Sequence, residues 1–336
     1  MKTVEKELCP DCDELTTPDI IEKEVKVTVR KEEYCVIVKR AVCWACNSEF
    51  GLSGIDFDEA ALAYNEYRRK HNYLFPEDVK NIREKYALNQ KSFSRLINSG
   101  ENTIHLYEKG GLQDGAHNEI IKQAENPEVM KNLYDDNNDA VTMDIRQAFE
   151  EKLKALLEEK NKNKMREIIQ SAFDFKQDIY CGYKKFDIEY FINFMLTILG
   201  FYKPLSTTHM GKIPCYLDFL KFKNEGVSFT GCRYVVGKYG PFLNDYSKLF
   251  CFLKDSGVVD SDIDISGSGE IYVPLRQPDM SVFSKKDADL IKEVALKLGP
   301  MSTQALKNKT HNEFPGWDEN KIGQLISFEN ARNVRL

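Results

Sequence analysis

The chain has 336 residues, of which 42% are hydrophobic, 30% charged and 11% aromatic. These values exclude a wholly disordered protein and indicate about two domains, with room for a third small one. The formal net charge of −6 excludes a surface that binds polyanions over its whole extent, so a nucleic-acid contact has to come from a local basic patch. No stretch approaches the roughly 20 apolar residues of a membrane span, and the first residues do not form a secretion signal. We therefore predict a cytoplasmic protein that makes no membrane contact.

Four cysteines in two Cys-x-x-Cys pairs mark the first segment, residues 1–55. Alternating hydrophobic residues between the pairs, over 25–29 and 34–38, predict two short β-strands that bring the pairs together. Four thiolates at this spacing suit one tetrahedral Zn²⁺ ion with no open position, so we predict a structural zinc site in a small β module. The predicted ligands are Cys9, Cys12, Cys43 and Cys46.

The remaining cysteines are interpreted from their surroundings. A redox Cys-x-x-Cys motif needs a βαβ context, which the first segment lacks, whereas iron stays an alternative to zinc in the four-cysteine site. Cys35 lies on an alternating strand and is predicted to be a small core residue. Apolar surroundings predict buried thiols at Cys181, Cys215, Cys232 and Cys251.

Residues 56–134 are predicted to form a five-helix helix-turn-helix domain of the repressor type. Asp56 and Asn89 can cap helices, Pro76 suits a first helical position, and Gly110 can end a helix. The predicted helices cover 57–71, 76–86, 89–97 and 101–109, with one or two closing helices over 119–134.

The helix-turn-helix itself is predicted from two short helices joined by the turn Asn98-Ser99-Gly100. Ser94 is small enough to let the helices approach each other closely. The residues spaced to pack the two helices together are Phe93, Leu96, Ile97, Ile104 and Tyr107. A plain helical bundle without a DNA-binding role is the alternative.

The second of these helices carries the candidate DNA contacts. Asn102 can bond adenine in the major groove, Thr103 can bond phosphate, and His105 either faces the groove or is merely exposed to solvent. The stretch from Lys80 to Lys109 holds six basic residues against three acidic ones, which suits a local footprint on DNA. The predicted cationic contacts are Lys91, Arg95 and Lys109.

These features resemble the MqsA-type antitoxins over about residues 8–134. The shared elements are the four cysteines, the helix at 57–71, Phe75-Pro76-Glu77 and the ending Tyr107-Glu108-Lys109-Gly110. The resemblance implies a zinc-binding domain before a DNA-binding domain of the phage-repressor class, which dimerises and represses its own operon. It also implies that Asn102 reads bases, whereas Leu106 stands where the family has a base-reading Arg.

Residues 135–172 are predicted to form a charged helical connector that begins with the acidic linker 135–139. After it, residues 173–336 are predicted to form a mostly helical domain, so the whole chain is an α+β protein in which helices dominate. A narrow apolar stripe along the connector helix consists of Ile145, Phe149, Leu153, Leu156 and Leu157.

The last segment resembles the Panacea, or SocA-like, domain over about residues 186–325. The elements that carry the resemblance are 217–222, 226–231, the Tyr-Gly-Pro-Phe run at 239–242, and Thr310-His311-Asn312-Glu313 with Trp317. The resemblance implies a domain that neutralises a toxin by binding it directly. Tyr239, Gly240, Pro241 and Phe242 are the candidate toxin contacts, and a simple turn after a strand is the alternative.

We therefore expect a type II antitoxin that binds a cognate toxin and, as a homodimer, represses its own operon on double-stranded operator DNA. Carrying both functions on one chain would allow toxin occupancy to alter repression. The alternative is a phage-type transcriptional regulator whose C-terminal domain binds a partner other than a toxin. An enzyme is not expected, because the sequence offers no cluster of nucleophilic and acid–base residues.

Overall fold

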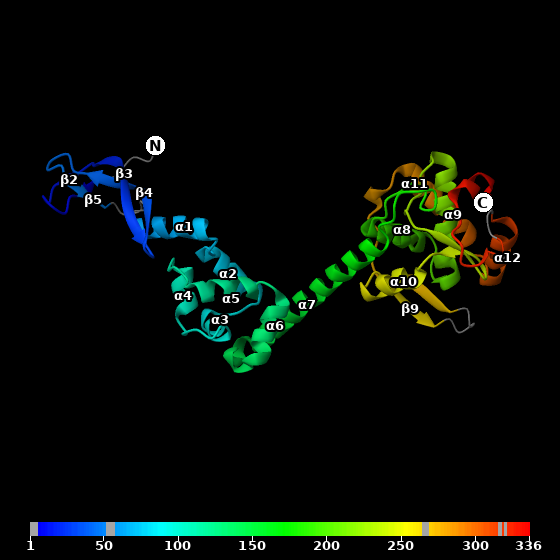
Figure 1. The fold of residues 1–336 in the computed structure, drawn as a ribbon, viewed down its shortest axis with the longest axis horizontal. Helices are drawn as coiled ribbons and strands as arrows, with labels where there is room; N and C mark the ends of the chain where they lie inside the picture. The colour runs from blue at the N-terminus through cyan, green and yellow to red at the C-terminus, as the bar shows by residue number, and fades with distance from the viewer. Residues whose placement is uncertain (1–5, 52–57, 264–268, 315–317, 319–320) are drawn as a thin grey trace. The chain divides into compact units, whose positions relative to one another are not determined.

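The computed structural model describes residues 6–51, 58–263, 269–314, 318 and 321–336. Figure 1 shows the order of the elements along the chain. The chain divides into two compact units, Met1–Glu158 and Glu159–Leu336, which are described separately below. Helices and small antiparallel sheets make up both units, and most of the regular structure is helical, which confirms the predicted α+β class with helices in the majority.

The first unit begins with a β module. Strands β3 (Asp19–Val29) and β4 (Glu32–Val42) form a long antiparallel hairpin, as the alternating pattern predicted. Its two-residue turn, Arg30-Lys31, has φ values of 48° and 73°, which suits the tight turns that join twisted strands. Shorter strands complete the module: β1 (Glu7–Leu8), β2 (Leu15–Thr16) and β5 (Glu49–Phe50).

Helix α1 (Glu59–His71) packs on one face of this hairpin. Tyr34, Val36 and Val38 point into the shared core, where they meet Ala63 and Tyr67 of α1. Because side chains alternate along a strand, Cys35 points to the opposite face and is exposed, so its prediction as a core residue is wrong. The cap of α1 is the Asp58 side chain, which accepts from the Ala61 amide at 3.0 Å; Asp56 and Phe57 lie outside the described residues.

Five helices follow and share a second core in the first unit. Asn89 caps α3 by accepting from the Ser92 amide at 2.8 Å, which confirms the predicted start. Helix α4 is shorter than predicted, because Asn102 forms its N-cap and the helix begins at Thr103. The helices are α2 (Pro76–Lys85), α3 (Gln90–Leu96), α4 (Thr103–Glu108), α5 (Gly115–Ala124) and α6 (Pro127–Asp136).

The segment predicted as an acidic linker is instead ordered and packed. Helix α6 extends to Asp136, the short 3-10 helix η1 (Asn138–Ala140) follows, and Ala140 and Val141 are buried. Helix α7 (Met143–Ala172) then begins, and its predicted apolar stripe packs into the same core, with Phe149 and Leu153 buried. The acidic residues 135–139 favour a linker, but Ala140 and Val141, which follow them directly, are buried and hold the segment in the core.

The second unit is built around two apolar helices, α8 (Ile188–Phe201) and α9 (Thr207–Glu225). A three-stranded sheet, ordered β6-β10-β9, and the hairpin β7-β8 complete the unit together with three further helices. The strands are β6 (Leu205–Ser206), β7 (Tyr234–Gly237), β8 (Gly240–Leu243), β9 (Val259–Ile263) and β10 (Glu270–Pro274). The other helices are α10 (Tyr246–Asp255), α11 (Lys285–Leu298) and α12 (Thr303–Glu313), with the short 3-10 helices η2 (Met280–Val282) and η4 (Phe328–Asn333).

Three of the four thiols predicted to be buried in this unit are buried. Cys181, Cys215 and Cys232 are buried as predicted, whereas Cys251 is exposed because it lies on the outer face of α10. Trp317 lies outside the described residues. Throughout the part of the chain that the structure describes, no helix combines the length and apolarity needed to cross a membrane.

Candidate functional site

The four predicted metal ligands converge in the β module. Cys9, Cys12, Cys43 and Cys46 place their sulfur atoms within 4.8 Å of one another. The Sγ atoms of Cys9 and Cys46 are 3.6 Å apart, and those of Cys12 and Cys43 are 3.8 Å apart. Tetrahedral coordination with metal–sulfur distances of about 2.3 Å requires sulfur atoms about 3.8 Å apart. The thiol positions therefore fit a single metal ion with four sulfur ligands.

Both cysteine pairs sit in turns of the same construction. In the first turn, the Cys9 amide donates to Glu14 O at 2.9 Å and the Asp13 amide donates to Cys9 O at 3.0 Å. In the second, Cys43 and Asn47 repeat these two bonds at 2.9 and 2.8 Å. Asp13 and Asn47 have φ values of 56° and 59°, a left-handed conformation that Asp and Asn tolerate better than most residues. Backbone geometry thus holds both pairs in place.

Ser48 is a residue at this site that sequence reasoning missed. Its hydroxyl lies 2.9 Å from the sulfur of Cys46 and 3.3 Å from that of Cys9. This hydrogen bond is the main reason that the pKa of Cys9 falls to about 6, and it also lowers the pKa of Cys46. A lower pKa favours the thiolate, which is the form that binds metal. The sequence signal for this role is that Ser48 follows Cys46, the last cysteine of the second pair, by two positions.

The two helices of the predicted helix-turn-helix, α3 and α4, pack on each other as expected. Phe93, Leu96, Ile97, Ile104 and Tyr107 are all buried in one core. The predicted small residue, Ser94, has a second role, because its hydroxyl accepts a hydrogen bond from the Ile104 amide at 3.2 Å. The start of α4 is thereby fastened to α3, which fixes the angle between the two helices.

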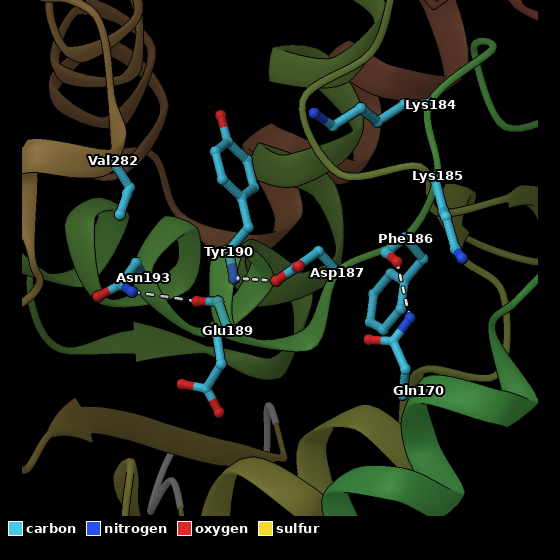
Figure 2. Close-up of a pocket in the computed structure, with 9 residues that line it drawn as sticks. All are labelled: Gln170, Lys184, Lys185, Phe186, Asp187, Glu189, Tyr190, Asn193 and Val282. Carbon is cyan, nitrogen blue, oxygen red and sulfur yellow. Dashed lines mark hydrogen bonds between the residues drawn. The ribbon is translucent and has the colours of Figure 1, made fainter.

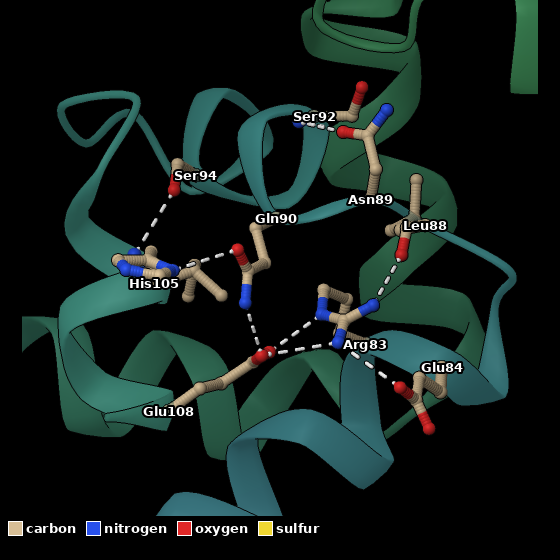
Figure 3. Close-up of polar contacts among 10 residues, drawn as sticks. Arg83, Glu84, Leu88, Asn89, Gln90, Ser92, Ser94, His105 and Glu108 are labelled. Carbon is tan, nitrogen blue, oxygen red and sulfur yellow. Dashed lines mark hydrogen bonds and ion pairs between the residues drawn. The ribbon is translucent and has the colours of Figure 1, made fainter. Parts of the chain in front are cut away.

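A buried polar network supports helices α3 and α4 (Figure 3). Arg83 of α2 donates to Glu108 of α4 at 2.6 Å, and both side chains are about nine-tenths buried. Gln90 donates to Glu108 at 2.6 Å, while its carbonyl oxygen lies 3.1 Å from His105 Nδ1. Burial acts to raise the pKa of Glu108, but the hydrogen bonds from Arg83 and Gln90 outweigh burial and lower it.

This network orients His105, one of the candidate DNA contacts, through Gln90. Sequence reasoning missed Gln90, because its position at the first turn of α3 shows no contact with α4 until the fold is known. Asn102 is exposed and its side chain makes no capping bond, and Thr103 follows it at the first position of α4. These residues occupy the N-terminal end of α4, whereas Lys109 lies at its C-cap.

Two of the predicted cationic contacts are engaged with a carboxylate. Arg95 forms a short ion pair with Glu101, and Lys91 Nζ lies 3.7 Å from the same carboxylate. The hydrogen bond from Arg95 is the main cause that lowers the pKa of Glu101, so this carboxylate is ionised at neutral pH. The positive charge of Lys91 and Arg95 is therefore partly offset in the free protein.

The four candidate toxin contacts lie on and beside the hairpin β7-β8 and differ in exposure. Tyr239 is 54% exposed, Gly240 and Pro241 are buried, and Phe242 is half-buried. Gly240 has a φ of 99°, and a Cβ atom there would lie 2.5 Å from Thr310 Oγ1, so this turn requires glycine. Tyr239 is therefore the member of the four that presents most of its side chain to a partner.

A buried lysine holds the turn from below. Lys212 of α9 is 1% exposed, and its ammonium group donates to Tyr239 O at 2.6 Å and to Pro241 O at 3.2 Å. Burial lowers the pKa of Lys212 to about 8. Sequence reasoning missed Lys212, because its apolar helix gives no sign that a lysine is buried there.

A cavity of about 720 Å³ lies at the start of α8. Figure 2 shows the residues that line it. Its polar side chains mostly serve the local fold: Asp187 caps the helix by accepting from the Tyr190 amide at 2.8 Å, and Gln170 donates to Phe186 O at 2.8 Å. Asn193 likewise donates to Glu189 O at 3.1 Å. These side chains bond to backbone groups and so stabilise the start of helix α8.

One comparison with known proteins gives a result. Residues 212–318 match the family described as the antitoxin SocA-like, Panacea domain. No curated protein and no solved structure gives a significant match. The matched range begins at Lys212 and includes the hairpin β7-β8. The second unit therefore carries a SocA-like Panacea antitoxin domain.

Proposed function

We propose that the protein is a type II antitoxin whose C-terminal unit binds and neutralises a toxin protein. The match of residues 212–318 to the SocA-like Panacea domain carries this proposal. The role proposed here is binding, not catalysis. The proposed division of labour follows the four segments expected from the sequence: a metal-binding module (1–55), a DNA-binding domain (56–134), a helical connector (135–172) and a toxin-binding domain (173–336).

The first unit, in this proposal, binds operator DNA and represses the operon of the antitoxin. The support is a packed helix-turn-helix with exposed Asn102 at the start of α4 and His105 oriented by Gln90. Lys91 and Arg95 contact phosphates once they exchange Glu101 for DNA. A homodimer that binds a palindromic operator follows from the resemblance to the MqsA-type antitoxins, with half-sites about one helical turn apart.

The four-cysteine site, we propose, holds a structural Zn²⁺ ion. Four sulfur ligands at tetrahedral spacing leave no position for substrate, and such sites stabilise modules that bury little apolar surface. The core around the cysteines is small and includes Ala41 and Phe50. The ion supplies cross-linking between the two turns, and the chain supplies the ligand geometry and the hydroxyl of Ser48.

A transcriptional regulator with a partner other than a toxin is the second candidate, because the helix-turn-helix supports either role equally. The two differ in whether a toxic protein is the partner. Full-length protein should form a complex with the product of the neighbouring small open reading frame on size exclusion, and that product alone should stop growth. A harmless neighbouring product would favour the regulator.

Coupling between the two functions is tested on the same complex. If toxin occupancy alters repression, the affinity for the promoter fragment of the operon changes when the toxin is bound. Equal affinity with and without toxin would show that the two activities are independent.

A further inference from the structure

A second cavity in the C-terminal unit, of about 630 Å³, lies beside the hairpin β7-β8. The start of α9, the hairpin, the start of α10 and Lys307 of α12 surround it. Three lysines line this cavity, and Asp245 is the single carboxylate among the described residues that line it. Asp245 is offset by Lys248 at 3.4 Å, so the cavity is cationic on a chain that is acidic overall.

The exposed charge gathers around one aromatic ring. The ammonium group of Lys307 lies 4.4 Å from the centre of the Tyr239 ring, and that of Lys238 lies 5.5 Å from it. Tyr239 is thus a half-exposed aromatic ring held beside two cations. Tyrosine is enriched among the residues that carry most of the binding energy in protein–protein contacts, where its rigid ring supplies area at small entropic cost.

Two aromatic rings also line this cavity. The rings of Phe242 and Tyr246 meet edge to face with centres 4.8 Å apart, and Tyr246 is 41% exposed. Phe242 packs directly over Gly211 of α9, where any larger residue would collide with the ring. The cavity therefore combines an aromatic wall, formed by Phe242 and Tyr246, with a cationic rim, formed by Lys238 and Lys307.

The hairpin is held rigidly in this shape. Lys212 ties two carbonyl groups of the turn to α9, and Gly240 leaves no space for a side chain between Lys212 and Thr310. A surface that is already in its binding conformation loses less entropy when a partner binds. Burying a lysine is costly, so its use here points to a turn whose conformation has to be maintained.

We propose that this cavity is the toxin-binding surface and that its occupant is an acidic segment of the toxin. A carboxylate of that segment sits between Lys238 and Lys307, and an apolar side chain beside it contacts Phe242 and Tyr246. Charge complementarity carries the choice of occupant, because the rim is cationic while the chain as a whole is acidic. This inference rests on the proposed antitoxin function and adds the place and the chemistry of the contact.

The test measures the affinity of the full-length chain for the product of the neighbouring small open reading frame, in low and moderate salt. The variant Lys238→Glu/Lys307→Glu reverses the two rim charges, and Lys238→Gln/Lys307→Gln only neutralises them. The control Lys285→Glu/Lys292→Glu makes the same change of net charge on exposed positions of α11. The neutralised variant keeps the test valid if charge reversal disturbs folding.

We expect charge reversal to weaken binding by about tenfold or more, chiefly through slower association, and neutralisation to weaken it less. Added salt should weaken binding of the wild type more than that of either rim variant. The control should stay within about twofold of the wild type. Rim variants that bind like the control would overturn the proposed surface while leaving the antitoxin function standing. A wild-type chain that does not bind this product at all would instead contradict the antitoxin function and, with it, the surface.

Discussion

The buried guanidinium group of Arg68 donates a hydrogen bond of 2.8 Å to the carbonyl oxygen of Gly110. Arg68 belongs to α1, which covers the β module, and Gly110 ends the stretch that contains the candidate DNA-binding helix α4. The same guanidinium reaches Gly111 O at 2.9 Å, and Arg30, in the hairpin turn of the β module, donates to Gln113 O. The β module and helix α1 are therefore joined through the side chains of Arg30 and Arg68 to the loop that follows α4.

The first prediction concerns Arg68. Replacing it with Met keeps the apolar stem but leaves two carbonyl groups without their donor, which should cost about 2–4 kcal/mol. Hydrogen exchange of amides in α4 and α5 should then become at least about tenfold faster. Arg69→Met is the matched control, because Arg69 is exposed on the same helix, where it pairs with Glu66 and lies over the ring of Phe75. Equal exchange in both variants would show that Arg68 does not hold this loop.

The second prediction concerns the carboxylate that engages Lys91 and Arg95. Glu101→Gln removes a negative charge from the proposed DNA-facing surface and releases two cations, which should tighten binding to any duplex by about fivefold. Fluorescence anisotropy with a duplex of unrelated sequence measures this effect, which should diminish as salt is added.

Glu119→Gln provides the control for this charge change. Glu119 lies on α5 and pairs with Lys122, away from the α3–α4 pair, so its removal should change DNA affinity little. If Glu101→Gln binds DNA no more tightly than this control, the phosphate contacts proposed for Lys91 and Arg95 are wrong.

The third prediction concerns the metal. Cys43→Ser removes a buried ligand, so the purified protein should lose its bound zinc, measured by elemental analysis. Hydrogen exchange in β1, β2 and β5 should increase as well, because these short strands have little other support. Cys35→Ser removes an exposed thiol outside the cluster and should keep about one zinc per chain. Zinc content that is unaffected by Cys43→Ser would contradict the four-sulfur site.

The fourth prediction concerns Asp218, a fully buried carboxylate in α9. It accepts from the Phe229 and Thr230 amides at 2.7 and 3.0 Å, and from the hydroxyl groups of Thr230 and Tyr234. Burial raises the pKa of Asp218 to about 6, against the opposing effect of these hydrogen bonds. The native state therefore binds the proton of Asp218 more tightly than the unfolded state does. Protonation of Asp218 stabilises the fold fully below the pKa of an unfolded aspartate, and this stabilisation is lost as pH rises through about 6.

Calorimetry can follow this loss as a falling melting temperature of the second unit between about pH 4 and 6. Asp218→Asn keeps an acceptor for the two amides and removes the titration, so its melting temperature should vary less over this window. Asp218→Ala leaves several buried donors unpaired and should cost about 3–5 kcal/mol. Equal pH dependence in the wild type and Asp218→Asn would contradict the role of this carboxylate.

Local signals in the sequence predicted much of the first unit correctly. Asn89 as a cap, Pro76 at a first helical position and the spacing of the core residues in α3 and α4 depend on neighbours only a few positions away. The clustering of the four cysteines also follows from their spacing, because Cys-x-x-Cys turns impose their own geometry. Such features can be read before the tertiary fold is known.

The features that sequence reasoning missed depend on contacts between distant segments. The residue pattern over 227–239 favours one strand, but only Tyr234–Gly237 is extended in a sheet, because Asp218 accepts hydrogen bonds from the Phe229 and Thr230 amides and holds them outside it. The role of Lys212 beneath the hairpin depends in the same way on a fold that brings α9 under the turn. Residue type alone did not identify the burial of Lys212 or Asp218, because lysine and aspartate side chains are usually exposed.

The most direct test of the antitoxin proposal is growth of cells that express the product of the neighbouring small open reading frame. Full-length protein and a fragment covering residues 159–336 should both restore growth, and both should co-purify with that product. A fragment covering residues 1–158 should do neither. Rescue by residues 1–158 alone, or a neighbouring product that does not impair growth, would contradict neutralisation by the Panacea-containing unit.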